Sequence, residues 1–281
     1  MALTITTLCE NTAGVLNVLG EWGLSVLLEC DGLNILLDTG QGKTVVHNAQ
    51  ALGVDLTRLD KIVLSHGHYD HTGGLLSLLG QSKKEIEVIA HPQVWQAKYA
   101  QRPGQERREY VGIPFQRQAL EGLGARFRLS ASPVWLSENI VVTGEIPLAN
   151  DYEKVDAGLF VWEGDEWLPD LLPDDQAVVV KTEMGLVVLL GCGHRGIMNT
   201  LHYAQELTGV ETVYAVVGGT HLFRSSAETL ERIVEALKGF GLVRLGASHC
   251  TGLPVAARLA RELGGGLFFN QAGTRLSLPL V

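Results

Sequence analysis

The sequence predicts a layered α/β protein whose two halves resemble each other. Runs of Leu, Ile and Val with the length of buried strands alternate with amphipathic runs of helix length. In each half, paired strands lead into a β-α-β unit, an arrangement that layers helices on a sheet. A chain of 281 residues with 46% hydrophobic and 19% charged residues can bury a large core, which excludes global disorder. This length fits either one large domain or two closely packed halves.

The first half opens with short strands, because its β-branched and leucine runs are only a few residues long. We expect these strands at residues 3–8, 25–30 and 34–37, the last ending in the turn Asp38-Thr39-Gly40. The elements expected after them are a helix at 43–52, a strand at 61–64, a helix at 75–79 and a strand at 87–90.

The second half repeats this pattern of paired strands followed by alternating helices and strands. The expected strands are at residues 177–181, 186–190, 212–217 and 243–246. The expected helices are at residues 197–207, 227–238 and 254–263. A layered structure follows from this order of elements.

Charge is low in total and unevenly distributed. The 22 Lys and Arg residues against 31 Asp and Glu residues give a net charge of −9, which argues against a general nucleic-acid or anionic-membrane binder. Residues 98–128 hold seven basic and three acidic residues, whereas residues 145–175 hold ten acidic residues and one lysine. Solvated surface explains both segments. Alternatively, residues 98–128 form an insertion that covers a site and binds an anionic group.

The cysteines and the N-terminal residues indicate the cellular compartment of the protein. The four cysteines are scattered and form no CxxC pair, so a disulfide framework is not expected. The N-terminal segment lacks the basic and apolar regions of a signal peptide, and the apolar runs fall short of the ~20 residues of a membrane helix. We therefore expect a cytoplasmic protein without membrane association.

The segment SHGHYDHTGG carries the strongest chemical signal. His66, His68, Asp70 and His71 lie within six residues, directly after an expected buried strand. Residues two apart on an extended chain point the same way, so His66 and His68 can bind one ion, while Asp70 and His71 turn toward a second position. Imidazole and carboxylate donors suit zinc, and iron or manganese also fit.

This HxHxDH constellation, together with the earlier Asp38-Thr39-Gly40 turn, resembles the metallo-β-lactamase superfamily. The resemblance implies an α+β fold, a four-layer αββα sandwich of two similar β-rich halves with helices outside. It implies two divalent metal ions at one edge, bound by loops from both halves. Residues 1–281 would then form a single metallo-β-lactamase-like domain with a substrate-covering insertion around residues 98–128.

The remaining ligands are expected where strands of the second half end. The candidates lie in three motifs: GCGHRG with Cys192 and His194, GGTHL with His221, and SHCTG with His249 and Cys250. His249 occupies the place of the superfamily's final histidine. Cys192 stands where a bridging aspartate is usual, and is either a thiolate ligand or a bystander. His194 replaces a mid-chain histidine that the sequence lacks, since His91 is more typical of an ordinary strand end.

The expected metal ligands are therefore His66, His68, Asp70, His71, His194 and His249. Asp70 would also orient the attacking water, and His221 or Tyr69 would protonate the leaving group. His221 is equally well interpreted as a loop histidine, and His47 and His202 as ordinary helix residues.

The four motifs together resemble one branch of the superfamily, the 7,8-dihydropterin-6-methyl-4-(β-D-ribofuranosyl)aminobenzene-5′-phosphate synthase-like metal-dependent hydrolases. This resemblance implies a small pterin- or phosphoribosyl-type substrate. Arg102, Arg107 and Arg108 are then natural phosphate partners, and amides around Gly193 and Arg195 could receive an oxyanion.

The expected activity is metal-dependent hydrolysis of a small, phosphate-bearing molecule. A water bridging two ions would have its pKa lowered toward neutrality and become a hydroxide nucleophile. The alternatives are a pterin-aminobenzene ribotide condensing synthase, a phosphodiesterase or nuclease, a thiolester hydrolase, and a non-catalytic metal-dependent sensor. The net charge argues against a polynucleotide substrate. The oligomeric state is left open, with a homodimer as one option.

Overall fold

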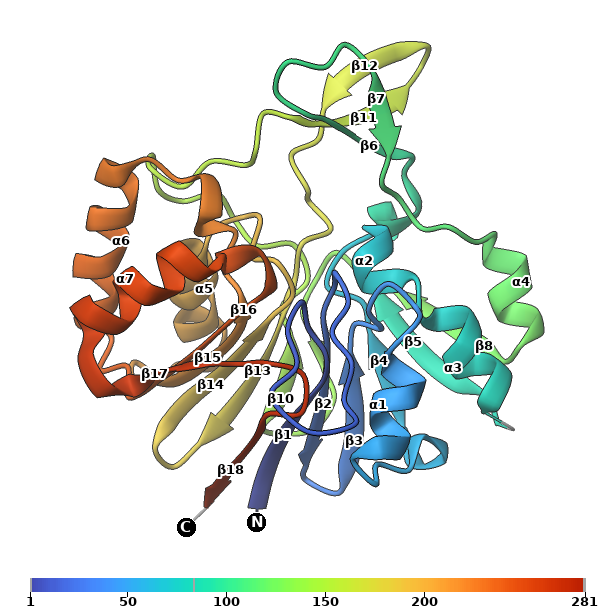
Figure 1. Ribbon diagram of the computed structural model, residues 1–281, viewed down its shortest axis with the longest axis horizontal. Coiled ribbons are helices and arrows are strands. Elements are labelled where there is room, and N and C mark those ends of the chain that lie inside the picture. The colour runs from blue at the N-terminus through green and yellow to red at the C-terminus, as the bar shows by residue number, and fades with distance from the viewer. Residues whose placement is uncertain (1, 83, 280–281) are drawn as a thin grey trace.

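Two sheets packed face to face form the centre of the molecule, and helices cover their outer faces (Figure 1). This is the arrangement in a computed structural model that describes residues 2–82 and 84–279. The four-layer αββα sandwich implied by the sequence is confirmed. In the described part of the chain, every helix is too short or too polar to span a bilayer.

The first sheet has the strand order β18-β1-β2-β3-β4-β5-β8. Pairing is antiparallel from β18 to β3 and parallel from β3 to β8. The strands are β1 (Ala2–Cys9), β2 (Ser25–Cys30), β3 (Leu33–Leu37), β4 (Lys61–Val63), β5 (Ile86–Ala90), β8 (Ala125–Leu129) and β18 (Arg275–Pro279). Its half of the chain also contains α1 (Val45–Ala51), α2 (Tyr69–Thr72), α3 (Leu75–Gln81) and α4 (Arg117–Gly122).

The second sheet repeats this plan with the order β17-β16-β15-β14-β13-β10-β9. Pairing is antiparallel from β9 to β14 and parallel from β14 to β17. The strands are β9 (Val134–Trp135), β10 (Ile140–Val142), β13 (Ala177–Thr182), β14 (Gly185–Leu190), β15 (Val213–Gly219), β16 (Arg244–Ser248) and β17 (Leu267–Phe269). Its helices are α5 (Ile197–Thr208), α6 (Ala227–Lys238) and α7 (Leu253–Leu263).

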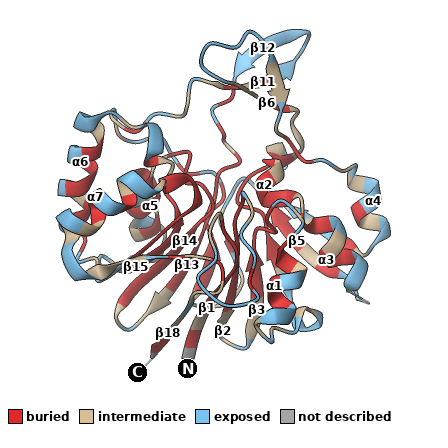
Figure 2. Ribbon diagram, viewed as in Figure 1, coloured by how far each residue is buried: buried red, intermediate tan, exposed pale blue. Residues whose placement is uncertain are grey.

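Side chains that point alternately to the two faces of each strand divide the hydrophobic core into layers. On β14, Val188 and Leu190 pack against the helices of the second half, whereas Val187 and Leu189 join the core between the two sheets. Side chains on a strand point alternately to its two faces, so a strand buried on both sides reads as a continuous apolar run. Figure 2 shows these central strands buried, while the helices expose only their outer faces.

A third sheet projects from one end of the sandwich (Figure 1). It has the order β12-β11-β6-β7 and consists of β6 (Lys98–Gln101), β7 (Arg108–Tyr110), β11 (Leu159–Glu163) and β12 (Glu166–Pro169). Residues 98–128 therefore divide, because β6 and β7 belong to this projecting sheet, whereas α4 and β8 belong to the first half. The hairpin β11–β12 comes from the acidic segment and pairs with the basic one.

The base of the projecting sheet contains a buried ionic cluster. The Lys98 ammonium lies 2.8 Å from carboxylate oxygens of both Asp170 and Asp174, and Lys98 is fully buried. The interpretation of both charged segments as solvated surface is therefore wrong for these three residues. Burial lowers the pKa of Lys98, but the two aspartates raise it more, so the ammonium stays protonated.

Candidate metal centre

The expected site residues meet at one edge of the sandwich, where several parallel strands end. Asp38 follows β3, the HxHxDH segment follows β4, Cys192 and His194 follow β14, and His249 follows β16. Parallel strands place their carboxyl ends at a common edge, which is where layered α/β folds hold their ligands. Both halves of the chain therefore contribute to one site.

His66 and His68 stand side by side after β4. Their rings are 4.5 Å apart, and His66 Nε2 lies 2.9 Å from His68 Nδ1. Between them, a Cβ on Gly67 would lie 2.2 Å from the Val94 carbonyl oxygen, so only glycine fits. The two side chains lie on the same side of the chain, as the spacing of residues on an extended chain predicts.

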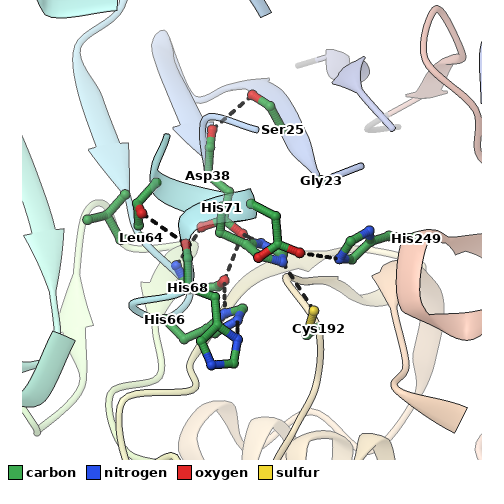
Figure 3. Close-up of polar contacts among 12 residues, drawn as sticks. Gly23, Ser25, Asp38, Leu64, His66, His68, His71, Cys192 and His249 are labelled. Atoms are coloured by element: carbon green, nitrogen blue, oxygen red, sulfur yellow. Dashed lines mark hydrogen bonds and ion pairs between the residues drawn. The ribbon is translucent and has the colours of Figure 1, made fainter. Parts of the chain in front are cut away.

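Hydrogen bonds to Asp38 determine which nitrogen of His66 is free. The Ser65 hydroxyl donates to Asp38 Oδ2 at 2.7 Å, so its oxygen must accept from His66 Nδ1 at 2.8 Å. His66 Nε2 is then unprotonated and available as a ligand. Ser25 Oγ donates to the Asp38 carbonyl oxygen and helps to hold this residue in its left-handed conformation (Figure 3).

His71 is oriented by the same carboxylate. Its Nδ1 lies 2.7 Å from Asp38 Oδ2, and its Nε2 lies 3.1 Å from the Cys192 sulfur (Figure 3). Burial alone would lower the pKa of His71, but Asp38 and Asp70 raise it to about 9. A carboxylate behind an imidazole is the usual way in which proteins orient a histidine toward a metal.

Asp70 and His249 face each other across the two halves, with 3.3 Å between Asp70 Oδ2 and His249 Nε2. His249 Nδ1 contacts Asn11 Oδ1 at 2.9 Å, which leaves Nε2 directed at the site. Burial raises the pKa of Asp70, but His71 and His249 lower it more, so the carboxylate remains ionised.

His194 completes a trio of imidazoles. Its ring lies 4.8 Å from that of His66 and 5.1 Å from that of His68. Burial holds the pKa of His194 well below its usual value, so the ring is neutral. The preceding loop approaches closely at Gly191, where a Cβ would lie 2.0 Å from Ser65 Oγ.

Donor atoms gather in three groups, each within 4.8 Å and each including Cys192. The groups are His66, Cys192 and His194; His71, Cys192 and His249; and Cys192, His221 and Cys250. Within the described residues, both nitrogens of His194 and Nε2 of His68 are buried without a hydrogen-bond partner. Such nitrogens are costly unless they bind something, so this donor set fits divalent transition metals.

His221 belongs to the third donor group, with Cys192 and Cys250, and its ring lies 4.2 Å from that of His194. It adopts a left-handed conformation, and its amide donates to Cys250 Sγ at 3.3 Å. Its Nε2 lies 3.9 Å from Asp156 Oδ2. Burial lowers the pKa of His221, but Asp156 and Cys250 raise it to about 9, so the ring is cationic at neutral pH.

A cavity of about 380 Å³, the metal-centre cavity, opens over these residues. Its floor includes His68, Asp70 and Cys192, and the projecting sheet contributes Ala100 and Leu159. A small-molecule site of this size is typical of enzymes.

The arginines expected to bind phosphate occupy different environments. Arg102 lines the metal-centre cavity and is mostly exposed, although it pairs with Glu109 at 3.1 Å. Arg107 is exposed, and the Arg108 guanidinium lies over the Phe160 and Trp167 rings. Arg195 is buried, its guanidinium donates to main-chain carbonyls, and its amide donates to Asp175.

The expected ligand set includes neither Asp38 nor Cys250, although Cys250 is among the candidates in the second half. Asp38 was noted only as part of a turn, and its contacts with Ser65 and His71 depend on the fold. Cys250 directly follows His249, so the SHCTG motif was the available signal.

This fold and this cluster define a metallo-β-lactamase-type protein. A sequence model of the metallo-beta-lactamase superfamily matches residues 23–196, more than half of the chain, and the chain belongs to that superfamily. The 7,8-dihydropterin-6-methyl-4-(beta-D-ribofuranosyl)-aminobenzene-5′-phosphate synthase of Methanocaldococcus jannaschii is 32% identical over 262 residues, covering 89% of this chain and 88% of the relative.

Comparison with solved structures supports the same superfamily assignment. Tm1679, described as a metal-dependent hydrolase of the beta-lactamase superfamily, matches with a TM-score of 0.84 and 30% identity over 98% of each chain. Zn²⁺-bound PqqB from Methylobacterium extorquens matches in fold alone, with a TM-score of 0.56 and 12% identity over 99% of this chain and 100% of that one. The resemblance inferred from the sequence motifs is thus confirmed.

Proposed function

We propose that this protein is a metal-dependent hydrolase of a small phosphate-bearing molecule, related to pterins or ribotides. The observation that carries the proposal is the convergence of His, Asp and Cys donors from both halves on the floor of the metal-centre cavity. Because the ligands come from both halves, these halves act as one functional unit, and the projecting sheet is its cover.

Two ions fit this arrangement. His66, His68 and His194 would hold one, and Asp70, His71 and His249 the other, with the Cys192 sulfur between the two groups. Imidazole and thiolate donors favour zinc, although iron or manganese is compatible with the carboxylate side. Bound divalent ions would supply Lewis-acid activation of the phosphate and of the attacking water.

The protein's own groups would handle protons and orientation. Asp70 is ionised and can orient the water that attacks the substrate. His221 is cationic at neutral pH and can donate a proton to the leaving oxygen. Arg102 can bind the phosphate at the rim of the cavity, with Arg107 in the same β6–β7 loop and Arg108 at the start of β7.

A condensing synthase is the second candidate, supported by the relative of similar length that is named as a synthase. In that reaction the amine nitrogen of an aminobenzene ribotide would attack the methylene carbon of a pterin diphosphate ester. A C–N bond would form while the C–O bond breaks, diphosphate would leave with the bonding electrons, and the nitrogen would lose its proton to Asp70.

Metal analysis combined with an activity screen tests the proposal. Purified protein is assayed for bound metal, for hydrolysis of small phosphoesters and pterin diphosphates, and for condensation when an aminobenzene ribotide is added. RNA and a thiolester panel test the remaining alternatives. Diphosphate release without the amine indicates hydrolysis, whereas release that requires the amine indicates condensation.

Variants of the candidate metal centre are compared with a variant of a histidine far from it. His66→Ala should lose both metal and activity, and Cys192→Ala should bind metal more weakly. His202→Ala changes an exposed histidine on α5 and should match the wild type. Full metal content and activity in His66→Ala would refute the assignment of the centre.

A further inference from the structure

A second cavity, of about 490 Å³, opens next to the metal-centre cavity. We call it the aromatic cavity because Trp22, Phe223 and Phe269 line it. Trp22 and Phe223 line both cavities, as do His249 and Cys250, so the two cavities adjoin. A ligand that occupied both would pass along these four shared residues.

The apolar side chains around this cavity are exposed to an unusual degree. Trp22 is 50% exposed, Phe223 41% and Phe269 46%, and Leu253 on the same rim is 64% exposed. They come from four separate parts of the chain, yet they surround one concave site. Exposed apolar groups gathered around a cavity mark a surface that a ligand covers.

The position of Trp22 connects this surface to the metal centre. Its ring centroid lies 5.0 Å from that of His249, with 60° between the ring planes. A flat ring stacked on Trp22 would therefore lie directly beside His249. Indole faces favour offset stacking with other aromatic rings.

Polar groups at one side of the aromatic cavity can form hydrogen bonds with a ligand. The buried Glu10 carboxylate is held in place because it accepts the amides of His249 and Thr12, each at 2.7 Å. A carboxylate has about four acceptor positions, so Glu10 can also accept from a ligand N–H. In the part of the chain that the structure describes, the Gln271 side-chain amide has no hydrogen-bond partner, and it lines the same cavity.

The distribution of cationic groups sets the direction of a bound ligand. Among the described residues that line the aromatic cavity there is no lysine or arginine, whereas Arg102 and Arg224 line the metal-centre cavity. A phosphate group is therefore favoured over the metal centre, and an uncharged flat ring in the aromatic cavity.

We infer that the aromatic cavity is the subsite for a planar, nitrogen-containing bicyclic ring of the pterin class, stacked on Trp22 and Phe223, whose phosphorylated arm extends over the metal centre. This inference rests on the proposed function, since the relative from Methanocaldococcus jannaschii is named for a dihydropterin.

Binding of the ring alone tests the subsite without catalysis. The protein as purified is titrated by calorimetry with 6-hydroxymethyl-7,8-dihydropterin, which has no phosphate to be released. Trp22→Ala and Phe223→Ala should each weaken binding by roughly five- to tenfold, as expected for the loss of one stacking partner. Trp22→Phe should restore most of the affinity. Trp135→Ala removes another exposed tryptophan, on β9, and should leave binding unchanged.

The outcomes separate the subsite from the proposed function. Ring binding that depends on Trp22 and Phe223, without turnover of any phosphorylated pterin, would support the subsite and count against the function. Turnover that is lost in His66→Ala but unchanged in Trp22→Ala and Phe223→Ala would overturn the subsite and leave the function standing. Absence of pterin binding by the wild type would also overturn the subsite. Thermal unfolding of each variant confirms that it is folded, and the two substitutions lie on separate segments, so one poorly folded variant does not decide the result.

Discussion

Replacing Lys98 by methionine should destabilise the protein strongly. The ammonium neutralises Asp170 and Asp174, and all three residues are buried. Without it, each carboxylate keeps one hydrogen bond, from the Leu172 amide to Asp170 and from the Gly67 amide to Asp174. Two uncompensated buried charges would then face each other. Removing one partner of a buried ion pair costs about 3–5 kcal/mol, so we expect a loss of about 4 kcal/mol.

Urea unfolding followed by circular dichroism measures this loss. With a slope of about 2–3 kcal/mol per M urea, the midpoint should fall by roughly 1.3–2 M. Burial raises the pKa of Asp174 even with Lys98 present. A carboxyl group whose pKa is higher in the folded state stabilises the fold when protonated, and this contribution is lost as the pH rises through the folded pKa. The deficit of Lys98→Met should therefore shrink as the pH falls from 8 to 5.

Two control variants test whether the loss of stability comes from unpaired buried charges. Lys61→Met removes a partly exposed pair with Glu87 and should cost less than about 1 kcal/mol. Adding Asp170→Asn and Asp174→Asn to Lys98→Met removes the unpaired charges and should recover part of the stability. A loss below about 1 kcal/mol for Lys98→Met at pH 8, with no dependence on pH, would refute the reasoning.

Three further predictions concern the metal centre. Asp38→Asn removes the anion behind His71, so metal affinity measured by chelator competition should fall about 10–100-fold, and unchanged affinity would contradict the orienting role. Gly191→Ala places a Cβ 2.0 Å from Ser65 Oγ and should cost about 1–3 kcal/mol in urea unfolding, whereas Gly80→Ala, with open space around its Cβ, should be tolerated. The raised pKa of His221, about 9, predicts that kcat falls as the pH rises through that value, and His221→Gln should lower kcat and abolish this limb of the profile.

Many strands and helices of both halves could be predicted because their signals are local, but α4 and the strands β8, β9, β10, β17 and β18 were not expected. Strands such as β13 and β14 are long apolar runs, and α6 has a regular apolar stripe. The projecting sheet could not be predicted, because β6 and β11 are short and lie far apart in the sequence. For the same reason, the basic character of Lys98 gave no hint that two distant aspartates bury it.

The same contrast between local and long-range signals applies to the candidate site. His66, His68, Asp70 and His71 lie within one motif, so their convergence follows from chain geometry. The sharing of Cys192 among three donor groups, and the orientation of His71 by Asp38, depend on how two sheets approach each other. No pattern within either segment encodes those distances.

The pairing of β1 with β18 bears on how the chain folds during its synthesis. Strand β1 ends at Cys9, whereas its neighbour β18 begins at Arg275 and is therefore synthesised much later. At 5–20 residues per second, β1 waits roughly 10–50 s for this partner. During that time one edge of the first sheet has unpaired backbone groups, which can pair with other chains. The sheet whose strands are synthesised first is thus completed last.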